Sequence, residues 1–420
     1  MKLLEQILHR NSINPEAVLS EAESLFLRNE DKAASRLLNS LEQQTLTPEQ
    51  RWSMLLLQGW ICHQHARHIQ AMEYADRVLS ESDDAYYLGR AHHLRGLSYR
   101  GKAYALPEDS ETEVAAAKQE FELALDLLTG RQEQLSVFSS LAILLADTDQ
   151  VDQAIALVES VLRGSLPPSE DLGWLHARLG ELYVQDKGDC ANGVKQLELA
   201  LSLLEPTSII HSWVHSLIAE CYNKAGEFER ACVHAKRALD LAKQDKGIQK
   251  FALIRAHEQY AISLAWGDFD LRLAERHLDI AIGIVDEESQ KEDELNVRLG
   301  EVLNMQGRNA EALPLLEKVI NRGGRVGVPR SLYALAGHVA VKSKEYLKAV
   351  EFLNLAVAES DGDVDLSIHS YLYLGIALYH LGRYDEASEA FRAGLRLAPA
   401  NHPEWSGLMK WLLAANRLKA

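Results

Sequence analysis

This chain of 420 residues lacks the features that would place it in several common protein classes. No apolar run reaches 18 residues, so we expect no membrane-spanning helix and no membrane partner. The first residues carry Glu5, His9 and Arg10 and no long apolar stretch, which argues against a secretory signal. The 25 glycines and 10 prolines are too few for a disordered or low-complexity chain. These absences favour a folded cytoplasmic protein.

Cysteine and positive charge are also scarce. The four cysteines at 62, 190, 221 and 232 include no pair at CxxC spacing, so we expect small buried thiols in a reducing compartment. Against 61 acidic residues there are 44 lysines and arginines, which gives a net charge of −17. A negative field of this size repels phosphate backbones, so no nucleic-acid partner is expected.

Motifs for catalysis and for cofactors are missing as well. No GxSxG, HExxH, P-loop or glycine-rich dinucleotide turn occurs, and the glycine-rich stretch 322–327 is interpreted as a linker. Cys62, His65 and His68 could share a helix side, but a closed zinc site needs four ligands. We therefore expect no enzyme, no metal and no cofactor. An enzyme with a hidden active site stays open as an alternative.

What the chain does have is a repeat. A small residue recurs ten times, and seven of the nine steps between these anchors measure 37 to 39 residues. Four residues after each anchor comes a second, usually larger apolar residue, and an i, i+4 pair lies on one helix face. The ten anchors are Ala34, Ala71, Ala117, Ala154, Gly193, Ala231, Ala274, Ala312, Ala349 and Ala387.

A second small residue precedes most anchors, on what would be the first helix of each unit. Six of these positions are glycine, although a glycine inside a helix costs about 1 kcal/mol relative to alanine. Close packing of the paired helices would explain that cost. The positions are Gly59, Gly96, Ala142, Gly180, Ala219, Ala261, Gly300, Gly337 and Gly375.

The last unit shows the pattern most completely, with Tyr371, Leu374-Gly375, Ala387, Phe391 and Pro399. In these residues the chain resembles the tetratricopeptide-repeat family, over roughly residues 15–401. The period is longer than the usual 34 residues of that family. The resemblance implies an all-α, right-handed α-solenoid of about ten helix-turn-helix repeats. Such repeats cannot bury their apolar faces alone and therefore stack.

The whole chain, 1–420, is expected to be a single solenoid. Residues 1–14 would form an N-terminal helix, 15–401 the repeats, and 402–420 a C-terminal capping helix. The third unit holds about nine extra residues, and Pro107 with the acidic residues around it predicts an exposed loop over Lys102–Val114. Trp405 and Trp411 could instead support homo-oligomers through the solenoid ends, an alternative left open.

The resemblance also implies where a partner would bind, because in that family the first helices line the concave groove. Trp174, Trp213 and Trp266 would be anchors, or else core residues between repeats; both interpretations stay open. The centre of the groove would be acidic and the third unit basic, which favours a basic or mixed-charge partner. The candidate binding residues are Arg90, His93, Arg100, Trp174, Glu181, Trp213, Glu220, Asn223, Glu258, Trp266, Glu301 and Asn304.

The sequence thus predicts a non-catalytic scaffold or adaptor that binds an extended or helical protein segment in its concave groove. The alternative is a regulatory sensor. Such a sensor would bind a short peptide or small ligand and pass a conformational change to a separate partner.

Overall fold

The computed structural model describes residues 14–27, 30–105, 110–164, 167–204, 210–244, 250–286, 289–322, 331–358 and 363–418. Over these residues the regular structure is entirely helical, with 21 α-helices and one short π-helix, Leu182–Asp186. The predicted all-α fold is therefore confirmed. The N-terminal helix expected over residues 1–14 lies, except for Asn14, outside the described residues.

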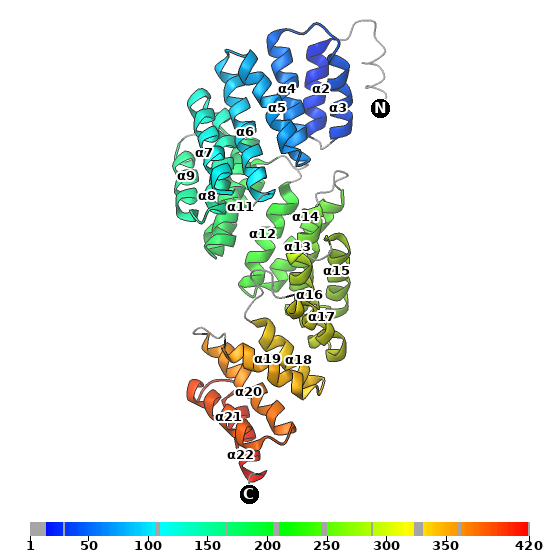
Figure 1. Cartoon of the computed structure of the whole chain (residues 1–420), viewed down its shortest axis with the longest axis vertical. Helices are drawn as coiled ribbons and strands as arrows, with labels where there is room; N and C mark the ends of the chain where they lie inside the picture. The colour runs from blue at the N-terminus through cyan, green and yellow to red at the C-terminus, as the bar shows by residue number, and fades with distance from the viewer. Residues whose placement is uncertain are drawn as a thin grey trace. The chain divides into compact units, whose positions relative to one another are not determined.

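The helices follow one another as ten helix–turn–helix segments and a final single helix (Figure 1). Their bounds are α2 (Pro15–Leu27) with α3 (Asp31–Leu41), α4 (Pro48–Gln64) with α5 (His68–Glu81), α6 (Ala85–Ala105) with α7 (Ser110–Leu127), α8 (Arg131–Asp147) with α9 (Val151–Leu162), α10 (Glu170–Glu181) with α11 (Cys190–Leu203), α12 (Ile210–Lys224) with α13 (Phe228–Gln244), α14 (Lys250–Trp266) with α15 (Leu271–Ile284), α16 (Gln290–Met305) with α17 (Asn309–Asn321), α18 (Ser331–Lys342) with α19 (Tyr346–Ala358), α20 (Val364–His380) with α21 (Tyr384–Leu397), and α22 (Trp405–Leu418).

The chain divides into two compact units. Unit 1 comprises Met1–Cys221 and Asp240–Gln249, and unit 2 comprises Tyr222–Leu239 and Lys250–Ala420. Each unit is considered by itself below. None of the described helices is long and apolar enough to cross a bilayer.

The anchors of the repeat form the centre of the packing. All nine anchor alanines are fully buried, and Gly193 is buried as well. The first-helix glycines face the large residue that follows the anchor by four positions. A Cβ added at Gly96 would lie 2.5 Å from Phe121 Cε1, and one at Gly180 would lie 2.6 Å from Leu197 Cγ. Gly300, Gly337 and Gly375 meet Leu316, Leu353 and Phe391 in the same way.

The glycines are therefore needed for space, as the sequence predicted. Gly59 departs from the rule. The residue four after its anchor is only Ala75, and the space above Gly59 is filled by Leu94 from the next pair.

The turns that the structure describes in full inside the pairs share one backbone conformation. A residue with φ between 54° and 77° stands near the end of the first helix in eight pairs. Glycine occupies four of these positions: Gly188, Gly226, Gly307 and Gly382. The other four carry side chains, which a left-handed conformation disfavours; they are Ala66, Asp149, Asp268 and Lys344.

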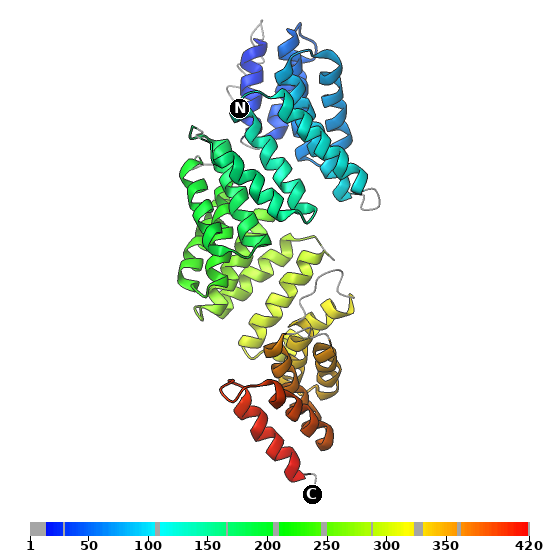
Figure 2. The ribbon, with the colours of Figure 1, turned by 90° about the vertical axis from the view of Figure 1, so that its left-hand side faces the viewer.

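The third pair corrects one expectation. Lys102–Val114 was expected to be an exposed loop, yet α6 continues to Ala105 and α7 already begins at Ser110. Lys102 Nζ donates to Glu113 Oε1 at 2.7 Å and so ties the two helices together. The surplus residues thus lengthen both helices of this pair, drawn in cyan in Figure 2. Acidic residues are frequent in loops but also in first turns of helices, and here Glu111 and Glu113 lie in the first turn of α7, whereas Pro107 lies outside the described residues.

The expected C-terminal cap is present in unit 2. Helix α22 packs on α21 and α20, and its Leu408 and Ala415 are fully buried. The ring of Trp411 lies 5.2 Å from Tyr379 and 6.5 Å from Phe391, centroid to centroid. Helix α22 therefore covers the apolar face that the tenth pair would otherwise expose.

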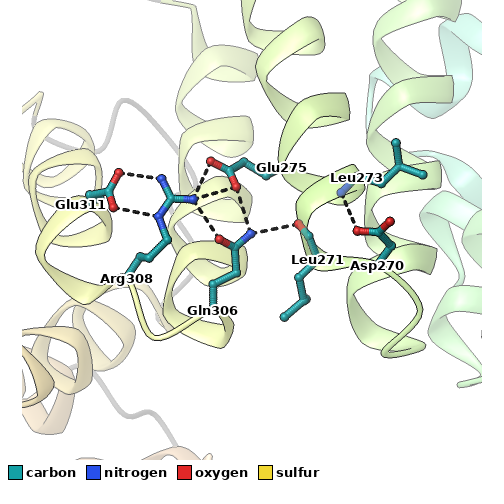
Figure 3. Close-up of polar contacts among 7 residues, drawn as sticks. All are labelled: Asp270, Leu271, Leu273, Glu275, Gln306, Arg308 and Glu311. Carbon is teal, nitrogen blue, oxygen red and sulfur yellow. Dashed lines mark hydrogen bonds and ion pairs between the residues drawn. The ribbon is translucent and has the colours of Figure 1, made fainter.

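A polar network fixes one junction between repeats in unit 2 (Figure 3). Arg308, which precedes α17, donates to both carboxylate oxygens of Glu275 on α15, each at 2.8 Å, and also to Glu311. Gln306 donates to Glu275 and to the Leu271 carbonyl, both at 3.0 Å. Burial opposes ionisation of Glu275, but the hydrogen bonds from Arg308 and Gln306 lower its pKa.

Candidate functional site

The lengthened third pair creates a hollow in unit 1. Its volume is about 290 Å³, and it lies between the end of α6, the start of α7 and the end of α8. Helix α8 stops at Asp147, where Thr148 Oγ1 donates to the carbonyls of Leu144 and Leu145. Because α6 and α7 carry extra turns beside this end, side chains from all three helices face one space. The lining residues are Arg100, Ala103, Tyr104, Ser110, Glu111, Val114, Leu144, Asp147 and Thr148.

One wall of the hollow is a fixed polar triangle. Arg100 Nε donates to Asp147 Oδ2 at 2.9 Å, and Arg100 Nη2 donates to the Tyr104 hydroxyl at 3.3 Å. The guanidinium also lies over the Tyr104 ring, 5.3 Å from its centroid. Burial and a hydrogen bond to Asp147 raise the pKa of Tyr104, so its hydroxyl stays protonated at neutral pH. The three side chains hold one another in place.

The remaining wall is apolar except at its rim. Ala103, Val114 and Leu144 supply the apolar surface. Glu111 is exposed, and it has no ion-pair partner among the residues that the structure describes. The charged lining residues are thus one cation, Arg100, and two carboxylates, Glu111 and Asp147. Since Arg100 and Asp147 neutralise each other, Glu111 leaves the hollow with a net negative charge.

A second polar group adjoins the hollow in unit 1. Arg178 on α10 forms an ion pair with Glu181, and its guanidinium lies 5.2 Å from the ring centroid of Trp213 on α12. Burial, with the nearby Arg100 cation, lowers the pKa of Arg178 to about 10, so it stays charged at neutral pH. The carboxylate of Asp147 and Tyr104 also act on Arg178. The Arg178 group therefore lies within electrostatic range of the polar residues that line the hollow.

Unit 2 repeats the same arrangement. Arg298 on α16 pairs with Glu301 at 3.0 Å and lies 5.9 Å from the ring centroid of Trp266 on α14. Burial raises the pKa of Glu301, although Arg298 acts in the opposite direction. Each unit thus has a tryptophan on a first helix with an arginine guanidinium over its ring. In both cases a glutamate three residues after the arginine pairs with it.

The predicted binding residues differ in how accessible they are. Trp174 is 38% exposed, whereas His93 is 5% exposed and bonded to Ser140 at 2.9 Å. Glu258 is 8% exposed and paired with Lys291. Arg90 donates to the Tyr86 hydroxyl at 3.0 Å. Asn223 bonds to Gln259 and Ser263. Glu220 and Asn304 are partly exposed.

These residues also fall on different units. Arg90, His93, Arg100, Trp174, Glu181, Trp213 and Glu220 belong to unit 1, and the other five belong to unit 2. The structure brings Arg100 into the hollow and places Glu181 and Trp213 beside Arg178. Sequence reasoning missed Tyr104, Glu111 and Asp147. The surplus of residues in the third repeat marked the position of Tyr104 and Glu111, but no sequence signal marked Asp147.

The sequence cluster around Cys62 does not converge. Cys62 is buried, while His65 Nε2 lies 3.0 Å from Asp31 Oδ2. His68 packs against His63 instead, with 5.4 Å between ring centroids. Within the described ranges, no three His, Cys, Asp or Glu side chains group as metal ligands.

Comparisons with known proteins agree with this fold. Models of the tetratricopeptide repeat match residues 369–401 and 297–318. No curated protein sequence matches the chain. Among solved structures, the apo form of the quorum sensor NprR from B. thuringiensis has a TM-score of 0.51 at 17% identity, over 76% of this chain and 91% of NprR.

Two further structures are similar over more of this chain. The apo form of RapI has a TM-score of 0.49 at 15% identity, over 87% of this chain and 97% of RapI. The human IFIT1 dimer with PPP-AAAA has a TM-score of 0.48 at 16% identity, over 91% of this chain and 84% of IFIT1. The two matched repeats, the buried anchors and the helical pairs together support a divergent tetratricopeptide-repeat protein.

Proposed function

We propose that this protein is a non-catalytic scaffold or adaptor of the cytoplasm that binds a segment of another protein. The segment lies against the first helices of unit 1, across the hollow and the Arg178 group. Tetratricopeptide repeats are stacked units with an extended binding surface, which is the general reason to expect a protein partner.

The observation that carries the proposal is the surface from Arg100 to Trp213. It combines a hollow of about 290 Å³ with a partly exposed tryptophan under a guanidinium. Aromatic and arginine side chains dominate the energy of protein interfaces. Arg100 and Arg178 are already held by Asp147 and Glu181, so binding loses little side-chain entropy.

Charge indicates the kind of partner. The chain has a net charge of −17, and the hollow itself is negative. A basic or mixed-charge segment would be steered towards this surface, and nucleic acid would be repelled.

Site-specific crosslinking tests the proposal. A photoreactive phenylalanine analogue replaces Trp174 on α10, and a matched control replaces Leu199 on α11 of the same pair. The two positions are 38% and 41% exposed, so they differ in helix and not in accessibility. We expect one protein to be captured from Trp174 and not from Leu199, and Trp213→Ala to weaken that capture. Identical products from both positions would refute a partner on the first helices.

The alternative is a sensor of a short peptide or small ligand, and the small volume of the hollow favours it. NprR, a quorum sensor, has the same fold. A captured species too small to be a protein, together with compaction of the chain in solution scattering, would replace the scaffold with the sensor.

A further inference from the structure

We infer that the hollow between α6, α7 and α8 receives one basic side chain, an arginine or a lysine, of the bound partner. This inference rests on the proposed function, because the partner segment supplies the side chain. It goes further by stating which residue chemistry the segment must carry at that point.

Volume limits the occupant to something small. Pockets for drug-sized ligands span about 300–1,000 Å³. The hollow, at about 290 Å³, is just below that range and suits a single side chain. A folded element of the partner would not enter it.

The walls suit a long aliphatic stem. Ala103, Val114 and Leu144 supply apolar lining, and Glu111 lines the same hollow at an exposed position. Lysine and arginine side chains bury their methylene groups on apolar surface and keep the charged end at its edge. A chain of three or four methylene groups can therefore follow these walls to the carboxylate.

The charges around the hollow determine which charge the bound side chain carries. The three described cations near the hollow are already engaged, beginning with Arg100 by Asp147 and Arg178 by Glu181. Lys102 is held by Glu113 at 2.7 Å. Glu111 is the charged lining residue without an ion-pair partner among the described residues. An acidic side chain would meet Glu111 and Asp147 as like charges, whereas a cation would pair with Glu111.

The test uses small probes on the full chain. Binding of N-acetyl-arginine N-methylamide is measured by ligand-observed NMR, beside the neutral citrulline analogue and the N-acetyl-glutamate analogue. We expect the arginine probe to bind in the millimolar range and the citrulline probe about five to ten times more weakly, since an exposed ion pair contributes modestly. The glutamate probe should not bind.

Variants locate the site. Glu111→Gln should bring arginine binding to the citrulline level and leave citrulline binding unchanged. Ala103→Phe fills the hollow and should abolish binding of both probes. Ala115→Phe, at an exposed position of α7 outside the lining, is the matched control and should have no effect. Glu111→Gln keeps the test valid if Ala103→Phe does not fold.

Equal binding of arginine and citrulline probes, stronger binding of the glutamate probe, or no binding at all would each overturn the inference. If the arginine probe fails while Trp174 still captures a partner, the inference falls and the proposed function stands. If the arginine probe binds but Trp174 and Leu199 give the same crosslinked products, the proposed function is wrong. The bound cation would then not come from a partner on the first helices.

Discussion

His93 makes the stability of unit 1 depend on pH. It lies 5% exposed on α6, with ring centroids 5.2 Å from Trp60 and 5.9 Å from Phe121. Ser140 Oγ donates to the Ser136 carbonyl, so it must accept from His93 Nε2, which fixes the tautomer of the neutral ring. Burial, together with the Arg90 cation and His63, lowers the pKa of His93 to about 3.

The magnitude follows from linkage between protonation and folding. An unfolded histidine has a pKa of about 6.5, so the unfolded chain binds the proton first as pH falls. The stability that neutral His93 contributes is complete above that pKa and is lost as the pH drops from about 6.5 towards 3. At pH 4.5, about two units below the unfolded pKa, the loss amounts to about 2–3 kcal/mol.

The perturbation that isolates this contribution is His93→Gln, whose amide can still donate to Ser140 but does not titrate near neutral pH. Urea denaturation of wild type and variant is followed by circular dichroism at pH 7 and pH 4.5. We expect the drop in unfolding free energy between the two pH values to be about 2–3 kcal/mol smaller in the variant. His63 and His338, whose pKa values burial lowers to about 4, add to the drop in both proteins alike. An equal drop in both proteins would refute the reasoning.

Five further substitutions test the packing and the backbone conformation of the turns. Gly96→Ala places a Cβ 2.5 Å from Phe121 and should lower the free energy of unfolding by about 1–3 kcal/mol. Gly283→Ala, whose Cβ would have nothing within 4 Å, should raise it by up to about 1 kcal/mol. Equal shifts of the two denaturation midpoints would contradict the spacing argument. Lys344→Gly removes a side chain from a left-handed backbone position, φ 65°, and should raise the free energy of unfolding by up to about 1 kcal/mol. Gly382→Ala adds a side chain at φ 77° and should lower it by about 1 kcal/mol; thermal unfolding measures both. Trp411→Ala should lower the free energy of unfolding by about 2–4 kcal/mol, because its ring packs on Tyr379 and Phe391. It should also expose the tenth pair, which concentration-dependent light scattering would detect. A variant that stays monomeric and equally stable would exclude the capping role.

Much of the fold could be predicted from the spacing of small and apolar residues in the sequence. The anchors and the residues four positions later are set by the geometry of one helix against its partner, so a constant period predicted both their burial and the glycines opposite them. The cap was readable for the same reason, because an apolar stripe on α22 must cover the last pair.

The candidate site was less predictable. Arg100 was identified, but its partners Tyr104 and Asp147 come from the end of a lengthened helix and from the next repeat, and no local period relates them. His93 had the polarity of a surface residue, yet one hydrogen bond to Ser140 made its burial possible. The single solenoid domain over 1–420 stays a prediction. The division into two units depends on contacts between distant segments that a repeat pattern does not encode.

The glycine contacts within each pair constrain how such a chain can change in length. Gly96, Gly180, Gly300, Gly337 and Gly375 each meet a large side chain from the second helix of the same pair. Duplication or deletion of a whole pair therefore keeps every contact of this kind, while a crossover between the two helices of a pair would set a glycine against the wrong partner. Gly59 is the exception, since Leu94 of the following pair fills its space. By this contact the second and third pairs should be inherited together, whereas the glycine contacts of the other pairs set no such requirement.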